Sequence, residues 1–224
     1  TQTEHGLIVH DDVIGLHDGS IVDTVSAARS RMRDGAHPER DASKPWKETR
    51  AIGGWQYTVM RLLLADYVLS MPRGAQIMYP KDIAQVIQSG DIRSGMSVLE
   101  SGAGSGAMSL NILEAVGEGG ELTTIEMRPD FARIAKANAT LYFGAYPQWW
   151  NVLVGDFDSV APSLAERASD RIVLDMLDPW NRLDQADRVL ALGGVPVALV
   201  TANTQISRLR RDLRLAATRR VLAP

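Results

Sequence analysis

Three closely spaced glycines provide the first chemical signal in the sequence. Gly102, Gly104 and Gly106 follow an apolar run and precede a helical pattern. Glycine permits a tight turn and lets the backbone N–H groups at a helix start approach a ligand closely. Glu126 ends the next apolar run, twenty residues after Gly106, where an acid is placed to bind ribose hydroxyls. The order of strand, glycine turn, helix, strand and acid therefore predicts a nucleotide-like cofactor.

The glycine spacing narrows the choice of cofactor. A dinucleotide site has the pattern G-x-G-x-x-G, whereas the third glycine comes one residue earlier here. Glu100 precedes the first glycine by two residues and completes the pattern E-x-G-x-G-x-G. This pattern resembles the first motif of class I S-adenosylmethionine (SAM) methyltransferases more than an NAD site. The alternative is a glycine-rich turn that binds no ligand.

Length and composition indicate a globular protein. The 224 residues allow one or two domains, and 45% hydrophobic with 23% charged residues are globular values. The chain has no cysteine, and histidines at 5, 10, 17 and 37 make no metal-ligand spacing. No apolar run approaches the roughly 18 residues of a membrane span, and the first residues do not resemble a secretion signal. We therefore expect a cytoplasmic protein with no bound metal and no membrane association.

The charge is small overall but unevenly placed. The net charge is −3, which argues weakly against nucleic-acid binding. Residues 29–50 hold seven basic residues against four acids, and residues 208–220 hold six arginines against one aspartate. Each run fits a solvated surface, but two such runs beside a methyltransferase-like core also fit a polyanionic substrate.

The first third of the chain predicts a small β domain, residues 1–72. Short strands are expected at 7–9, 13–15 and 20–22, with a hairpin turn at Asp18–Gly19. Residues 24–54 lose periodicity and predict a long exposed loop. A strand is expected over 55–64 and a helical turn over 64–70, before a break at 71–74.

Residues 73–224 predict a catalytic domain of the α/β class, a doubly wound and mostly parallel sheet. Strands are expected at 97–100, 121–126, 151–154, 171–175 and 195–200, and helices at 80–89, 107–116, 129–141, 180–190 and 204–214. Residues 215–222 are expected to form a last strand. Such sheets normally close with a two-stranded hairpin, so residues are suspected to be absent between about Arg214 and Leu215. The alternative is a truncated sheet with an exposed edge.

Acids end three of the expected parallel strands. In such a sheet the ligand lies at the carboxyl ends of the strands. Glu126 suits ribose hydroxyls, and Asp156 is placed to accept a hydrogen bond from an adenine amino group. Asp175 ends the fourth strand and faces the position of the methyl acceptor. Each acid alone also fits a helix cap or a loop.

Several blocks resemble the tRNA methyltransferases that act on N1 of adenine 58 in the T-loop. The matching blocks are Met-Pro-Arg-Gly at 71–74, Gln-Ile-Met-Tyr-Pro-Lys-Asp at 76–82, the glycine motif at 98–106, Leu-Asp-Met-Leu-Asp-Pro-Trp at 174–180, and Thr-Gln at 204–205. The resemblance implies that SAM is the cofactor, tRNA the partner and a homotetramer the assembly.

The resemblance also assigns site residues. It implies that Asp175 is catalytic, accepting a hydrogen bond from the adenine amino group and stabilising the charge that develops on the ring. Tyr79 is the candidate for stacking on the flipped base, although plain core packing also accounts for it. The cofactor-binding set that it implies is Gln76, Tyr79, Gly102, Ala103, Gly104, Ser105, Gly106, Glu126, Asp156 and Asp175.

Two other functions remain open from the sequence. One is a methyltransferase on the same sheet that acts on a protein or a small molecule, such as an isoaspartyl-type enzyme. The other is a non-catalytic RNA-binding partner subunit. The aromatic residues between 142 and 150 are interpreted as core or loop packing, and Asp178 is not assigned a catalytic role.

Overall fold

The computed structural model describes residues 2–3, 6–7, 16, 19–23, 56–58, 62–200 and 202–222. Contacts divide the chain into two compact units, Thr1–Leu63 and Leu64–Pro224. The division falls after Leu63, whereas the sequence places the boundary at 72. The helix between these positions, α2 (Leu64–Ser70), therefore belongs to the second unit. The expected loop at 24–54 and the expected strand at 13–15 lie outside the described residues.

The first unit contains two antiparallel strand pairs. Strand β1 (Gln2–Thr3) pairs with β2 (Gly6–Leu7). Strand β3 (Ile21–Asp23) pairs with β4 (Gln56–Thr58). The sequence therefore correctly indicated β structure before residue 60, but β3 pairs across more than thirty intervening residues, with β4.

The second unit is built on a five-stranded sheet in which all neighbouring strands are parallel. The strand order is β7-β6-β5-β8-β9. The strands are β5 (Ser97–Ser101), β6 (Glu121–Glu126), β7 (Trp150–Val154), β8 (Ser169–Leu174) and β9 (Leu190–Ala198). This confirms the predicted doubly wound sheet, in which the chain starts at the centre, moves to one edge, and returns to build the other side.

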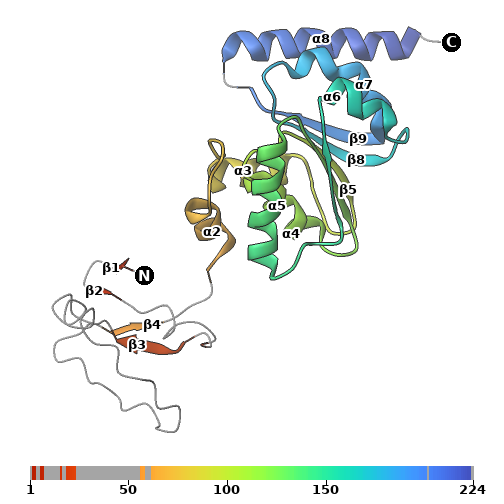
Figure 1. Cartoon of the computed structure of the whole chain (residues 1–224). Helices are drawn as coiled ribbons and strands as arrows, with labels where there is room; N and C mark the ends of the chain where they lie inside the picture. Colours follow the sequence, from red (N-terminus) through yellow and green to blue (C-terminus); the bar gives the residue numbers. More distant parts are fainter. Residues whose placement is uncertain are drawn as a thin grey trace. The chain divides into compact units, whose positions relative to one another are not determined.

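Helices cover both faces of the sheet (Figure 1). One face packs against α3 (Pro80–Ser89), α4 (Ala107–Val116) and α5 (Pro129–Phe143). The other packs against α6 (Phe157–Val160), the 3₁₀ turn η2 (Ala161–Ser163) and α7 (Leu183–Val189), which follows the 3₁₀ turn η3 (Pro179–Arg182). Residues alternate along β5, so Val98 belongs to the first core and Leu99 to the second.

The aromatic residues between α5 and β7 belong to the first core, as expected from the sequence. Tyr146 stacks on Trp150 with ring centroids 5.9 Å apart, and Phe143 meets Trp149 edge to face at 5.6 Å. All four pack in or against the cluster that α4 and α5 form on the sheet. These rings therefore fix the α5–β7 connection.

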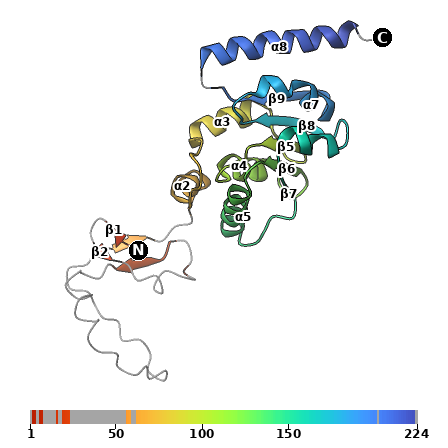
Figure 2. The ribbon, with the colours of Figure 1, turned by 45° about the horizontal axis from the view of Figure 1, so that its top comes forward.

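The chain after β9 differs from the expectation. The predicted strand at 215–222 is wrong, because α8 runs without a break from Asn203 to Leu222. Neither glycine nor proline interrupts residues 203–222, and leucine, alanine and arginine are good helix formers. Figure 2 shows α8 beyond α7 on the outside of the unit, and it packs against η3 and α7. Among the described residues, no helix is long and apolar enough to cross a membrane.

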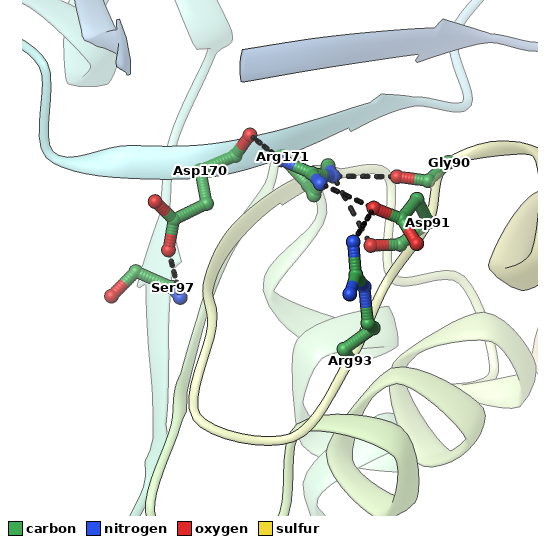
Figure 3. A network of polar contacts seen from close by, with 6 residues as sticks. All are labelled: Gly90, Asp91, Arg93, Ser97, Asp170 and Arg171. Atoms are coloured by element: carbon green, nitrogen blue, oxygen red, sulfur yellow. Dashed lines mark hydrogen bonds and ion pairs between the residues drawn. The ribbon is translucent and has the colours of Figure 1, made fainter. Parts of the chain in front are cut away.

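Arg171 joins the amino end of β8 to the residues directly after α3, and Asp170 joins it to β5 (Figure 3). Arg171, which is 9% exposed, donates through Nε to the carbonyl of Gly90 at 2.6 Å and through Nη2 to the carboxylate of Asp91 at 2.9 Å. The carboxylate of Asp170 accepts a hydrogen bond from the backbone N–H of Ser97 at 2.9 Å. The buried guanidinium therefore has partners on two sides, as a desolvated charge requires.

Candidate active site

The carboxyl ends of four parallel strands surround a cavity of about 440 Å³. The cavity walls come from the turn after β5, the end of β6, the starts of α5 and α6, and the loop after β8. Six of the predicted site residues line it together: Gln76, Gly102, Gly104, Glu126, Asp156 and Asp175. The strand order therefore brings residues from positions 76 to 175 to one place.

The glycine turn lies against the loop after β8. Gly102 has a φ of 97°, and a Cβ atom added to it would lie 2.3 Å from the carbonyl oxygen of Asp175. The N–H of Gly102 donates to Ile125, and the N–H of Asp175 donates to Ser101, each at 2.9 Å. Only glycine tolerates both this backbone conformation and this close approach. The turn is consequently fixed between the ends of β6 and β8.

Glu126 supports the turn and also faces the cavity. Its Oε2 accepts a hydrogen bond from the N–H of Gly104 at 3.0 Å, and its Oε1 accepts one from the N–H of Arg128 at 2.9 Å. A carboxylate oxygen has two lone pairs, so each oxygen keeps capacity for a further donor. Glu126 can therefore bind hydroxyl groups of a ligand while it holds the turn in place.

Two further carboxylates open into the cavity. Asp156 directly precedes α6 but makes no capping hydrogen bond with its side chain. Asp175 makes no side-chain hydrogen bond with any residue that the structure describes. Solvent reaches the Asp175 side chain through the cavity, but partial desolvation, followed by the nearby charge of Glu126, raises the pKa of Asp175. Both groups remain available to accept hydrogen bonds from a ligand.

Ser105 fastens the segment that carries Gln76 to the glycine turn. Its hydroxyl accepts hydrogen bonds from the N–H groups of Gly74 and Ala75, both at 3.1 Å, and donates to the carbonyl of Ala75 at 3.0 Å. The amide of Asn138 donates to the carbonyls of Pro72 and Ser105, at 2.9 and 2.8 Å. Gln76 is thereby placed at the cavity by contacts between segments that are distant in sequence.

Four of the predicted site residues do not line the cavity. Ala103, Ser105 and Gly106 belong to the glycine turn but lie behind its inner surface, and Gly106 precedes the first residue of α4. Tyr79 precedes α3 and is 57% exposed. It is therefore placed outside the cavity and open to a large ligand.

The sequence analysis did not identify three residues that line the cavity: Arg128, Phe131 and Arg182. Arg182 contacts the carboxylate of Asp178 at 2.5 Å and that of Asp158 at 3.0 Å, which ties the loop after β8 to α6. On another wall, the guanidinium of Arg128 lies 3.6 Å from the ring centroid of Phe131. The position of Arg128 and Phe131 directly after the Glu126 strand was an available signal. Nothing in the sequence marked Arg182.

Glu100 lies beneath the turn and not in the cavity. It is fully buried, and its Oε2 accepts hydrogen bonds from the hydroxyls of Ser109 at 2.6 Å and Thr124 at 2.8 Å. Thr124 in turn accepts one from the indole N–H of Trp150 at 2.8 Å. Burial raises the pKa of Glu100 to about 7 despite these donors. The first acid of the glycine motif thus links β5, β6, β7 and α4.

Comparison with known proteins identifies the family. The model of the family described as tRNA methyltransferase complex GCD14 subunit matches residues 26–215. The chain belongs to this family. It is 34% identical over 158 residues to a tRNA (adenine(58)-N(1))-methyltransferase TrmI of Thermus thermophilus, a match that covers 70% of this chain and 60% of that protein. A relative from Methanocaldococcus jannaschii, a tRNA (adenine(57)-N(1)/adenine(58)-N(1))-methyltransferase TrmI, is 30% identical over 164 residues, or 64% of this chain and 58% of that protein.

Solved structures agree on the fold. A SAM-dependent O-methyltransferase from Thermotoga maritima matches 95% of this chain and 68% of its own, with a TM-score of 0.73 and 25% identity. The tRNA (m1A58) methyltransferase TrmI of Aquifex aeolicus matches 71% of this chain and 62% of its own, with a TM-score of 0.64 and 24% identity. The chain therefore has the class I methyltransferase fold. It spans about 60% of the length of the curated relatives that it matches.

Proposed function

We propose that this protein transfers a methyl group from SAM to N1 of adenine 58 in the T-loop of tRNA. The observation that carries the proposal is the Asp175 carboxylate, which opens into the cavity beside the glycine turn and has no partner among the described residues. The family match supports the tRNA substrate, because relatives that align over most of the chain are named for methylation of adenine 58.

The residues around the cavity fit the cofactor. Glu126 accepts hydrogen bonds from the ribose hydroxyls with the lone pairs left by Gly104 and Arg128. Asp156, whose side chain makes no helix-capping hydrogen bond, accepts a hydrogen bond from the adenine amino group of the cofactor. Gln76 and the backbone of the glycine turn contact the remainder of the cofactor. The cofactor supplies an electrophilic methyl group when it is bound.

Asp175 activates the acceptor base. Its carboxylate accepts a hydrogen bond from the exocyclic amino group of adenine, which raises the electron density at N1. As N1 gains the methyl group the ring becomes positively charged, and the nearby carboxylate stabilises that charge in a partly desolvated site. N1 carries its own lone pair, so no general base is needed. Positioning of N1 contributes further to the rate.

The proposal includes an RNA base that leaves its stack. The target adenine must be flipped out to reach the cavity, and exposed Tyr79 is the stacking candidate outside it. The working assembly is a homotetramer in the cytoplasm, in which basic surfaces of neighbouring subunits converge on one tRNA. This arrangement would reconcile RNA binding with a net charge of −3 per chain.

Nucleoside analysis of treated tRNA tests the proposal. Unmodified tRNA transcripts are incubated with SAM and either the wild type or Asp175→Ala, and 1-methyladenosine is quantified. The wild type should form it only in transcripts with adenine at position 58, and a transcript with guanosine there is the control. If the wild type forms no 1-methyladenosine in any T-loop, the proposal is wrong.

The same experiment separates the alternatives. An isoaspartyl peptide is offered in parallel, because the Thermotoga neighbour is described as an O-methyltransferase. Methyl transfer to the peptide but not to tRNA would support the protein-methylating alternative. Calorimetric titration with SAM addresses the partner-subunit alternative: tRNA binding with no heat of SAM binding would favour it over catalysis.

A further inference from the structure

One face of α8 carries a row of polar and basic side chains. Thr204, Ser207, Arg208 and Arg211 follow the spacing i, i+3, i+4, i+7, which places them on a single face of a helix. Together with Asn203 they line a groove of about 550 Å³, and all five are exposed. We name these five residues the α8 stripe. The apolar residues Ile206, Leu209 and Leu213 lie on the opposite face of the helix.

The α8 stripe is chemically suited to phosphate groups. Arginine presents a planar fork of donors that matches phosphate oxygens, and hydroxyl and amide side chains are common partners of nucleic-acid backbones. Residues 203–214 hold four arginines and one aspartate, a net charge of +3 in a chain whose total is −3. Asp212 accepts from Nε of Arg211 at 3.1 Å and lies 3.9 Å from Nε of Arg208. Both terminal amino groups of Arg211, and Nη1 of Arg208, have no partner among the described residues and can bind another anion.

The α8 stripe adjoins the wall of the active-site cavity. The guanidinium of Arg208 lies 4.7 Å from the ring centroid of Trp180, within the range of a cation–π contact. Its Nη2 also donates to the side-chain oxygen of Asn181 at 3.5 Å. Trp180 and Asn181 belong to η3, and the same short turn provides Arg182 to the cavity wall. The α8 stripe is therefore in direct contact, through Arg208, with η3, which follows Asp175 in the chain.

We propose that the α8 stripe binds the phosphodiester backbone of the tRNA whose base enters the cavity. This inference rests on the proposed function, because it assigns the surface to that same substrate. Two guanidiniums about one turn apart, preceded along the same face by hydroxyl and amide side chains, fit a polymer with a charge at each repeat. The backbone contacts orient the RNA and carry no base specificity, which leaves recognition of adenine to the cavity.

The test compares arginines on two faces of one helix. Arg211→Gln and the double variant Arg208→Gln/Arg211→Gln remove charge from the α8 stripe. Arg210→Gln is the matched control, since adjacent residues point about 100° apart around a helix, and Arg210 is also exposed. Binding of a fluorescent tRNA transcript to the 224-residue chain is measured by anisotropy over a range of salt concentrations.

We expect Arg211→Gln to weaken RNA binding about fivefold at low salt and the double variant at least about tenfold. Each lost phosphate contact should also reduce the slope of log K against log salt by about 1. Arg210→Gln should stay within about twofold of the wild type with an unchanged slope. Affinity for SAM should be the same in all four proteins. Turnover at saturating RNA should be kept, with the loss confined to KM.

Several outcomes would overturn the proposal. The proposal is wrong if Arg211→Gln binds tRNA as tightly as the wild type, or if Arg210→Gln loses as much tRNA affinity as Arg211→Gln. It is also wrong if the wild type binds no tRNA, or if polyglutamate competes for the surface as effectively as RNA does. The last would assign the α8 stripe to an acidic protein. The proposed function fails separately: a wild type that binds tRNA through the α8 stripe but forms no 1-methyladenosine refutes methylation alone. A wild type that methylates while the variants bind normally refutes the docking surface alone.

Discussion

The two ends of strand β8 differ in how their charged groups are satisfied. At the amino end, the Arg171 guanidinium is buried and donates to the carbonyls of Gly90 and Asp170 and to the carboxylate of Asp91. At the carboxyl end, the Asp175 carboxylate has no side-chain partner among the described residues and borders a cavity. The first arrangement stabilises the fold, whereas the second leaves a partly desolvated charge available to a ligand. Along one strand, Arg171, which stabilises the fold, and Asp175, which we propose acts on the substrate, are therefore four positions apart.

The largest expected effect is that of replacing Asp175, at the carboxyl end of β8. Asp175→Ala should lower methyl transfer about 10²–10³-fold, the usual cost of losing one preorganised electrostatic group. The affinity for SAM should stay within a few-fold. The free energy of unfolding at neutral pH should not fall, because burial and Glu126 already disfavour the charge on Asp175. Turnover and denaturant unfolding measure both quantities, and a clear loss of stability would contradict the comparison.

The second prediction tests the amino end. Arg171→Leu should lower the free energy of unfolding by about 3 kcal/mol, because the buried or half-buried carbonyls of Gly90, Asp91 and Asp170 lose a charged donor. Turnover per folded molecule should be unchanged, because Arg171 lies near the amino end of β8, whereas the cavity lies beyond its carboxyl end. The control is Arg93→Gln, which breaks an ion pair to Asp91 whose side chains are 68% and 47% exposed. Solvent-exposed pairs of this kind contribute little to stability. Similar losses in both variants would remove the special role of Arg171.

The third prediction concerns Glu100 of β5, which pairs with Val173 of β8, between the positions of Arg171 and Asp175. Its pKa is about 7 in the folded protein against 4.5 for an unperturbed glutamate, so the folded state binds the proton more tightly. Its contribution to stability is therefore present at acidic pH and is lost as the pH rises from about 4.5 to about 7, by on the order of 3 kcal/mol. Glu100→Gln should lack this loss. The difference in unfolding free energy between the two proteins at pH 5 and pH 8 measures it, and parallel pH profiles would contradict the raised pKa.

The smallest expected effect concerns Asp156. Asp156→Ala should weaken SAM binding about three- to tenfold through loss of one charged hydrogen-bond acceptor. Stability should change by less than about 0.5 kcal/mol, because the side chain caps no helix in the structure. Calorimetric titration and thermal unfolding provide the two measurements. Asp158→Ala serves as the comparison, since it removes a neighbouring carboxylate that is paired with Arg182.

The sequence predicted the sheet and the strand-end acids because each leaves a local signal. An apolar run followed by a glycine turn or an acid is readable within a short window, and the parallel order then follows from the alternation of strands and helices. The sequence did not reveal Ser105 as the support of Gln76, or Arg182 as the link between Asp178 and Asp158. These contacts join segments that are distant along the chain, and no local pattern encodes them. The strand expected at 215–222 is wrong. It was expected because such sheets normally close with a hairpin, whereas those residues have good helix propensity and continue α8.

The two carbonyls held by Asn138 have a consequence for the residues that this position tolerates. One side-chain amide donates both of its N–H groups, to Pro72 and to Ser105, while its own backbone carbonyl accepts from the hydroxyl of Tyr67 at 2.8 Å. Aspartate has the same shape but would present only acceptors to those two carbonyl oxygens. The position therefore selects for hydrogen-bond polarity and not for size, and a library of substitutions there should reject the isostere before it rejects a smaller side chain.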